Sequence, residues 1–223
     1  MHATKEQTKV LGHLALHYGP GDEPPARLLL ELLGCTLVDN GPKPGSDGFC
    51  TVLIDGDTAN YAENIMFLSR ATDEQLQLED AIRAGLSAGS TDEAPALRDY
   101  RRSTVGAPES ISHIGIRYAS FEALEKVLCD IEAAAAPGGA LDGRVEVVKY
   151  KARPGLDAAV DARIAASPVF TGDERPAFAD YWVQCFVHTD LCGFGILAFG
   201  HTFELDFVFE PFFARPPSFG TPR

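Results

Sequence analysis

The stretch GHLALHY at residues 12–18 decides the interpretation of the fold, because it aligns without gaps with SHIGIRY at residues 112–118. Each copy carries histidine at its second position and tyrosine at its last position. Apolar and polar residues alternate between them, which is typical of a β-strand with one buried face. An internal repeat with an offset of 100 residues therefore predicts two similar units that each open on a strand.

Similar elements follow each copy of the repeat. Residues 121–131 form an apolar stripe with helical spacing after Ser120, a favourable N-cap residue. Residues 26–34 follow several prolines and end at a glycine, which also predicts a helix. Each half then has three further strand candidates, at residues 35–39, 49–55 and 64–69 and at residues 144–151, 181–188 and 202–210. Each half therefore predicts the order β-α-β-β-β.

The expected division of the chain is a first unit at residues 1–86, a polar linker at 87–109 and a second unit at 110–223. An additional amphipathic helix at residues 72–86 completes the first unit. The second unit contains a long irregular segment at residues 152–179 and ends in a proline-rich tail. A loop of that length is typical of a functional lid or a partly disordered segment.

Composition excludes several functional classes. The chain has 19 lysines and arginines against 32 aspartates and glutamates, for a net charge of −13, so we expect no nucleic acid as partner. Its apolar runs are shorter than the roughly 20 residues of a membrane-spanning helix, so we expect no membrane partner. The polar N-terminus resembles no secretory signal, and the five cysteines form no CxxC pair. These features favour a cytoplasmic protein.

Two β-α-β-β-β units, each opening on a strand with a histidine, resemble the vicinal oxygen chelate superfamily. This superfamily includes glyoxalase I, methylmalonyl-CoA epimerase, extradiol ring-cleaving dioxygenases and bleomycin-resistance proteins. The resemblance covers about residues 9–69 and 111–213 and implies an α+β fold, in which two βαβββ units paired in one chain form a cleft from curved sheets. In that superfamily a divalent metal is held by the first and last strands of the units. Carried over by position, this implies His13, His113 and Glu204 as metal ligands.

The residues around Glu204 agree in part with this implied site. In residues 202–209 the phenylalanines and Leu205 share one face, while Glu204 and Asp206 share the other, which can line a polar cleft. Asp206 and Glu210 remain alternatives to Glu204. Two histidines and one carboxylate form the ligand set of non-haem iron(II) sites, so we expect iron first, with zinc, manganese, nickel or cobalt as alternatives. The open positions would let a small-molecule substrate chelate the metal.

The last strand of the first half departs from the family pattern. Residues 64–69 have no carboxylate or amide in the middle, so the fourth ligand of glyoxalase-like and epimerase-like members is missing. This favours dioxygenase-type chemistry over a lyase or isomerase, although the sequence FGILAFGHTFE at residues 194–204 lacks the usual ring-cleaving signature. The alternative is a metal-free small-molecule binding or resistance protein, with a cleft lined by aromatic residues such as Trp182. A homodimer is a further possibility that the sequence does not decide.

Two further positions share the faces of the repeat histidines. His17 lies on the face of His13, and Arg117 lies on the face of His113. Both are candidate substrate contacts. Arg117 could hold a substrate carboxylate through two hydrogen bonds, and its pairing with one of the chain's many acids is the alternative.

The strand at residues 181–188 supplies the remaining candidates. His188 shares a face with Gln184 and Trp182, which are candidate substrate contacts. A histidine of near-neutral pKa on that face would be a catalytic general acid or base. A histidine in a surface loop is the alternative interpretation.

Overall fold

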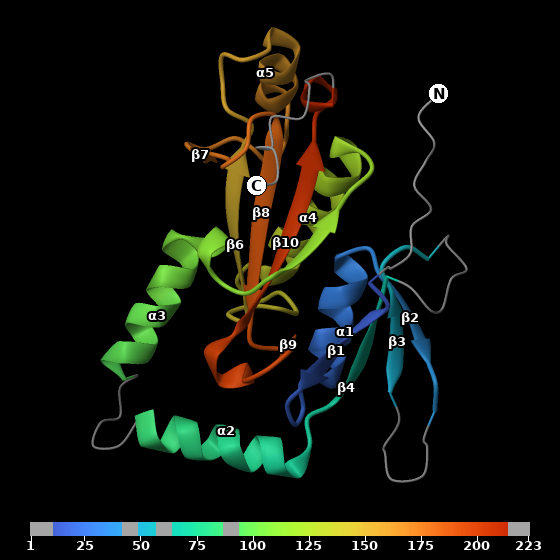
Figure 1. The fold of residues 1–223 in the computed structure, drawn as a ribbon, viewed down its shortest axis with the longest axis vertical. Helices are drawn as coiled ribbons and strands as arrows, with labels where there is room; N and C mark the ends of the chain where they lie inside the picture. Colours follow the sequence, from blue (N-terminus) through green and yellow to red (C-terminus); the bar gives the residue numbers. More distant parts are fainter. Residues whose placement is uncertain (1–10, 42–48, 57–63, 87–93, 214–223) are drawn as a thin grey trace, which may run out of the picture. The chain divides into compact units, whose positions relative to one another are not determined.

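The computed structural model describes residues 11–41, 49–56, 64–86 and 94–213. These residues form five α-helices and two five-stranded sheets, which confirms the predicted α+β class (Figure 1). Contacts divide the chain into one unit of Met1–Arg101 and Thr189–His201 and a second unit of Arg102–His188 and Thr202–Arg223. No helix in the described ranges is long and apolar enough to span a membrane.

The sheet of the first unit has the strand order β2-β3-β4-β1-β9. Its first strand pairs in parallel with β4, and β3 pairs antiparallel with both β2 and β4. At the other edge β9 pairs antiparallel with β1. The strands are β1 (His13–Tyr18), β2 (Thr36–Asp39), β3 (Cys50–Leu53), β4 (Ile65–Arg70) and β9 (Cys192–Gly193).

Helix α1 (Glu23–Leu32) supplies the apolar side of the first unit's core. Prolines at its start cost no hydrogen bond, because the first backbone N–H groups of a helix have no partner within the helix. Its buried residues are Ala26, Leu29 and Leu30, while Leu16 and Met66 are buried in the sheet. The alternation of the strands therefore places their apolar side chains on one face and His13 and His17 on the other.

A buried carboxylate brings a late segment of the chain into the first unit. Helix α2 (Asp73–Leu86) begins after Thr72, whose hydroxyl accepts the N–H of Gln75 at 3.2 Å. On this helix the Glu79 carboxylate accepts the N–H groups of Leu197 and Ala198 at 2.9 and 2.7 Å. Leu197 and Ala198 are the first two residues of the short 3-10 helix Leu197–Phe199. Residues 189–201 therefore join the first unit, although the sequence-based division places them in the second.

The predicted polar linker at residues 87–109 contains regular structure. Helix α3 (Pro95–Gly106) and a short 3-10 helix, Pro108–Ser110, occupy much of it. Thr104 is the buried residue of α3, so the apolar stripe that indicates a helix in a sequence is almost absent. Residues 87–93 and the tail from residue 214 lie outside the described residues.

The sheet of the second unit has the strand order β5-β10-β8-β6-β7. Its first strand pairs in parallel with β10, with Gly115 opposite Glu204 and Arg117 opposite Asp206. The same relation between first and last strand holds for β1 and β4. The strands are β5 (Ile114–Arg117), β6 (Val145–Lys151), β7 (Arg175–Pro176), β8 (Trp182–Thr189) and β10 (His201–Val208).

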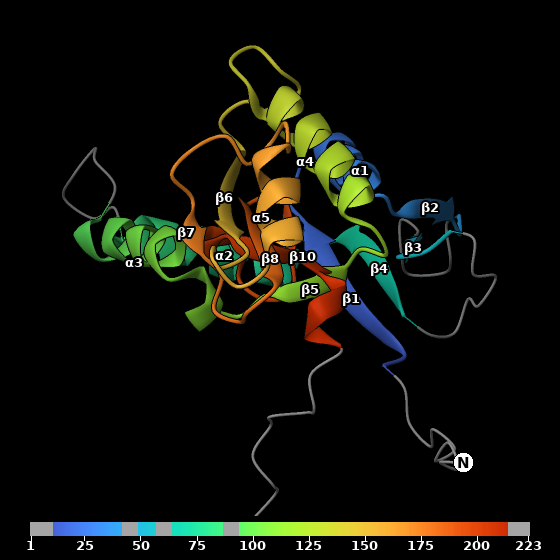
Figure 2. The same cartoon turned by 90° about the horizontal axis from the view of Figure 1, so that it is seen from above.

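Two helices accompany this second sheet (Figure 2). Helix α4 (Phe121–Ala135) begins at Ser120, whose hydroxyl accepts the N–H of Ala123 at 3.1 Å, as the sequence predicts. Helix α5 (Ala158–Ala165) lies within the long irregular segment at 152–179. Its Arg163 donates a hydrogen bond to Glu125 of α4 at 2.9 Å and covers the Phe121 ring. This ion pair holds α5 against α4.

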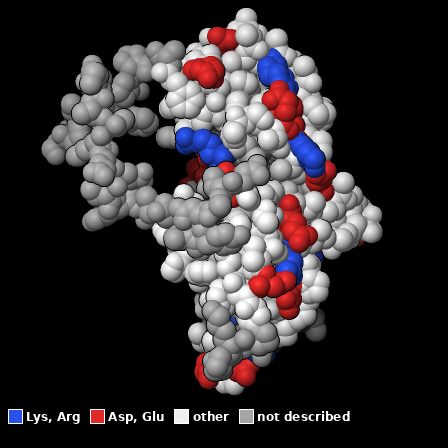
Figure 3. Space-filling view, turned by 90° about the vertical axis from the view of Figure 1, so that its right-hand side faces the viewer, with Lys and Arg blue, Asp and Glu red and all other residues white. Residues whose placement is uncertain are grey.

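Opposite charges are paired on the surface of each unit. On the face drawn in Figure 3, basic side chains lie beside acidic ones. Arg27 with Asp39 in the first unit and Lys126 with Asp130 in the second are examples of such pairs. Exposed pairs of this kind contribute little to stability, but they prevent a surface of a single sign.

Candidate functional site

One face of the second unit's sheet concentrates the polar residues. On the opposite face the alternating residues Val183, Cys185, Phe203 and Leu205 are buried and apolar. We call the face that carries the polar side chains the polar face. Its members lie on β5, β8 and β10 or at their ends, and they are His113, Arg117, Trp182, Gln184, His188, Glu204 and Asp206. The polar face therefore carries all the site residues predicted for this unit.

His113 and Glu204 meet on the polar face. The Nε2 atom of His113 lies 2.8 Å from the Oε2 atom of Glu204. The Nδ1 atom of His113 lies 2.8 Å from the carbonyl oxygen of Ile111. A carbonyl oxygen only accepts hydrogen bonds, so Nδ1 is placed to donate to Ile111, while Nε2 faces the carboxylate and the protonation state of the ring decides whether it donates there. Two of the three predicted metal ligands are thus adjacent within one unit.

The carboxylate of Glu204 is buried and held in place by Gln184. Glu204 is only 8% exposed, and its Oε1 atom accepts a hydrogen bond from Gln184 Nε2 at 2.6 Å. The side-chain oxygen of Gln184 accepts the backbone N–H of Phe178 at 3.1 Å. This chain of hydrogen bonds fixes one carboxylate oxygen and leaves the other directed at His113.

The arrangement fits two ligands of one metal ion. Histidine nitrogen and carboxylate oxygen bind zinc-like ions at about 2.0–2.2 Å, so two neighbouring ligands lie about 3 Å apart. Metal-binding histidines also commonly donate their other ring N–H to a carbonyl, as His113 does to Ile111. Within the described ranges, no group of three or more histidine, cysteine or acidic side chains is placed to hold a metal. His113 and Glu204 would therefore supply two positions and leave others open.

His13 and His17 belong to the first unit. The His13 ring packs beside Phe67, with ring centres 4.9 Å apart, and His17 Nδ1 lies 3.2 Å from the Ser69 hydroxyl. A role of His13 as third ligand, and of His17 as a substrate contact, stays a prediction of the sequence.

Asp206, Arg117 and Trp182 form the next group along the polar face. The Asp206 carboxyl is 8% exposed, and burial together with the neighbouring Glu204 carboxylate raises its pKa to about 7, while Arg117 acts in the opposite direction. The central carbon of the Arg117 guanidinium lies 4.9 Å from the centre of the Trp182 ring. The sequence pattern places Arg117 and Trp182 on different strands and does not predict this contact.

His188 is the candidate general acid or base of the polar face. Burial lowers the pKa of its imidazole to about 4, below the near-neutral value that a general acid or base would need. Its Nδ1 atom lies 2.8 Å from the Thr202 hydroxyl. The imidazole is therefore neutral at pH 7, and it cannot supply a proton as an imidazolium there. The alternation of residues along the strand predicts that His188 shares a face with Gln184 and Trp182. It carries no information about how deeply the side chain is buried.

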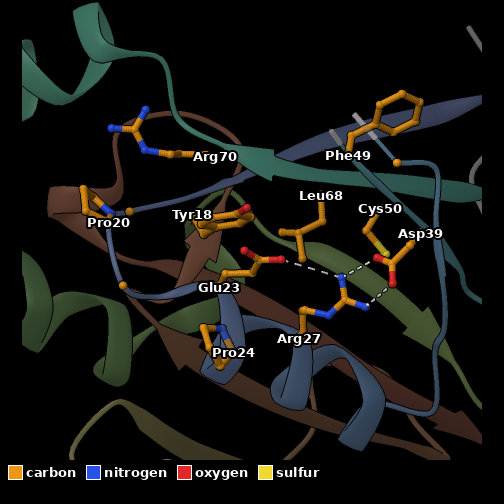
Figure 4. Close-up of a pocket in the computed structure, with 13 residues that line it drawn as sticks. Tyr18, Pro20, Glu23, Pro24, Arg27, Asp39, Phe49, Cys50, Leu68 and Arg70 are labelled. Atoms are coloured by element: carbon orange, nitrogen blue, oxygen red, sulfur yellow. Dashed lines mark hydrogen bonds and ion pairs between the residues drawn. The ribbon is translucent and has the colours of Figure 1, made fainter. Parts of the chain in front are cut away.

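A cavity of about 750 Å³ lies in the first unit, at the start of α1 (Figure 4). Arg27 points between two acids, at 2.8 Å from Asp39 and 3.9 Å from Glu23, and this environment raises its pKa. Burial raises the pKa of the Cys50 thiol on the cavity wall. Since its arginine is already paired and its thiol is less acidic than usual, this cavity is a weaker candidate for catalysis than the polar face.

Comparison with protein-family models, with curated proteins and with solved structures finds no match to the chain.

Two groups of this site escaped prediction from sequence. The carbonyl of Ile111 and the N–H of Phe178 are backbone groups, and any residue type supplies them. The position of Ile111 two residues before His113 is the only sequence signal for the first. For Phe178 the fold of the segment before β8 is required.

Proposed function

We propose that the chain is a metal-dependent enzyme similar to members of the vicinal oxygen chelate superfamily, in which His113 and Glu204 bind a divalent metal ion. Its substrate is a small oxygenated molecule that takes open positions on the metal. The two units are, in this proposal, repeats of one βαβββ unit. In support, each sheet pairs its first strand in parallel with its last long strand, and a helix follows each first strand.

The separation of 2.8 Å between His113 Nε2 and Glu204 Oε2 carries the proposal. With the ring proton on Nδ1, both facing atoms are acceptors and repel each other unless something positive lies between them. Either a second proton on the ring or a metal ion meets this need. A preorganised carboxylate and a histidine of fixed tautomer favour the metal.

The protein's own groups would orient this centre. Gln184 fixes one oxygen of Glu204, and the Ile111 carbonyl fixes the ring plane of His113. A bound divalent ion would polarise the oxygen atoms of a chelating substrate. The ligand set expected from the sequence, two histidines and one carboxylate, favours iron and dioxygenase-type chemistry, with zinc, manganese, nickel or cobalt as alternatives.

Metal analysis of anaerobically purified protein tests the proposal. We expect about one divalent ion per chain, its loss in His113→Ala and Glu204→Gln, and its retention in the control His201→Ala, whose side chain packs beside Phe194. The variant His13→Ala tests the third ligand. Absence of metal after reconstitution, or full metal content in His113→Ala, would show that a proton joins the pair. A metal-free binding protein would then be the better interpretation.

A further inference from the structure

We propose that the substrate of this metal centre is a carboxylic acid whose carboxylate is bound by Arg117. This inference rests on the proposed function and extends it to the substrate class. It depends on how Arg117 is placed, on the absence of an ion pair to it among the described residues and on the open space at Gly115.

Arg117 lies in line with the proposed metal ligands. His113, Gly115 and Arg117 follow one another at every second position, so they share a face. Gly115 lies opposite Glu204 in the parallel pair of strands. A Cβ atom built on Gly115 would meet no other atom within 4 Å. On this face the backbone between His113 and Arg117 therefore carries no side chain, and the position of a Cβ atom there is open space.

Among the described residues Arg117 forms no ion pair within 4.0 Å, although its charge acts electrostatically on the Asp206 carboxyl opposite it. Its opposite residue is Asp206, but no carboxylate oxygen of the described ranges lies within the 4.0 Å of an ion pair. By contrast, Arg27 lies 2.8 Å from Asp39, and Arg163 lies 3.0 Å from Glu122. In a chain with a net charge of −13, an arginine left without such a partner on a polar face is available for an anionic ligand.

The Trp182 ring orients the Arg117 guanidinium. The separation of 4.9 Å between the central guanidinium carbon and the ring centre is within the range of a cation–π contact. The N–H donors of the guanidinium can form the two parallel hydrogen bonds that a carboxylate accepts. A guanidinium held in this way loses less conformational entropy when it binds an anion.

The spacing of the two positions restricts the substrate. The backbone positions of Glu204 and Arg117 are offset by two residues along paired strands, which corresponds to about 7 Å along the strand before the length of the Arg117 side chain is added. A compact acid fits, with two vicinal oxygen atoms at one end to chelate the metal and a carboxylate at the other end. The chemical class is thus a small oxo, hydroxy or dihydroxy acid.

Two chelating probes test this inference on protein loaded with cobalt(II). Acetohydroxamate chelates through two oxygens and lacks a carboxylate, while the monohydroxamate of succinate adds one. Isothermal titration calorimetry gives the dissociation constant of each probe for the wild-type protein and for Arg117→Gln, Arg117→Lys and Lys126→Gln. Lys126 is an exposed cation of α4 and controls for the loss of one positive charge.

We expect the wild-type protein and Lys126→Gln to bind the carboxylated probe about tenfold more tightly than acetohydroxamate. Arg117→Gln should abolish this preference without changing the affinity for acetohydroxamate, and Arg117→Lys should keep part of it. Equal affinities in the wild-type protein, or a preference that survives in Arg117→Gln, would overturn this inference alone. A protein that binds neither cobalt nor acetohydroxamate would overturn the proposed function and this inference together.

Discussion

The two repeat histidines occupy corresponding positions and have different neighbours. His113 immediately precedes β5, and the paired strand β10 places Glu204 opposite Gly115. His13 opens β1, and the paired strand β4 places Phe67 opposite Ala15. His113 therefore faces a carboxylate at 2.8 Å, whereas the ring of His13 packs on a phenyl ring. The same pairing of strands therefore supports a polar site in the second unit and an aromatic surface in the first.

Exchanging the carboxylate tests this difference most strongly. Glu204→Gln removes the negative charge that pairs with His113, so we expect metal binding to fall below detection by elemental analysis. Phe67→Leu at the corresponding position of the first unit should leave metal binding unchanged. Equal metal contents in the two variants would remove the distinction between the units.

The next largest effect is expected on metal affinity when the hydrogen bond from Gln184 to Glu204 is removed. Gln184→Leu keeps the ligands but frees one carboxylate oxygen, so metal affinity should fall about 10–100-fold. A matched control is Gln75→Leu, because Gln75 also donates to a carboxylate, that of Glu79 in the first unit, at 3.1 Å. Competition with a chromogenic chelator measures both affinities. If Gln75→Leu weakens metal binding as strongly, the effect is not specific to the polar face.

Glu79 provides a test confined to the first unit. Glu79→Gln leaves one of the N–H groups of Leu197 and Ala198 facing an amide N–H₂ group, which costs about 1–3 kcal/mol. We expect the free energy of unfolding, measured in urea, to fall by this amount. Metal affinity of the folded protein should stay constant. A variant of unchanged stability would show that residues 189–201 are held in the first unit by other contacts.

The smallest expected effect concerns the pH dependence of the second unit. Burial acts to raise the Glu125 pKa, but hydrogen bonds from Arg163 and Ser167 outweigh it and hold this pKa below the ordinary 4.5. The ionised pair stabilises the fold above that value. This contribution is lost as the pH falls through the lower pKa of the folded state. Arg163→Met should reduce the loss of stability between neutral and acidic pH, as followed by thermal unfolding, and an unchanged pH profile would contradict this assignment.

Strands β1 and β10 were predictable because apolar and polar residues alternate along residues 13–18 and 202–210, whereas residues 64–69 contain a short apolar run. The strands β7 and β9 have two residues each and leave no such pattern. Helix α3 was missed because a surface helix is recognised in a sequence by the apolar residues that it buries. Thr104 is the only buried residue of α3 among those described. The assignment of residues 189–201 to the first unit depends on hydrogen bonds to Glu79, which leave no local pattern.

The candidate site was predictable to a similar extent. The resemblance implies His113 and Glu204 as ligands from a first and a last strand, and the structure pairs these strands in parallel, a relation that the strand patterns did not predict. The low pKa of His188 was not predictable, because burial is a property of the packed molecule. The supports from Ile111 and Phe178 come from backbone groups and leave no signature in the side chains.

The most direct test is to observe the ring nitrogens of His113 by NMR in ¹⁵N-labelled protein during a titration with Zn²⁺, using His113→Asn to assign the signals. The account predicts that Nδ1 stays protonated toward the Ile111 carbonyl, while Nε2 changes to a metal-bound chemical shift at one equivalent. An Nε2 atom that remains protonated in excess Zn²⁺ would contradict it, because a proton would then join His113 to Glu204.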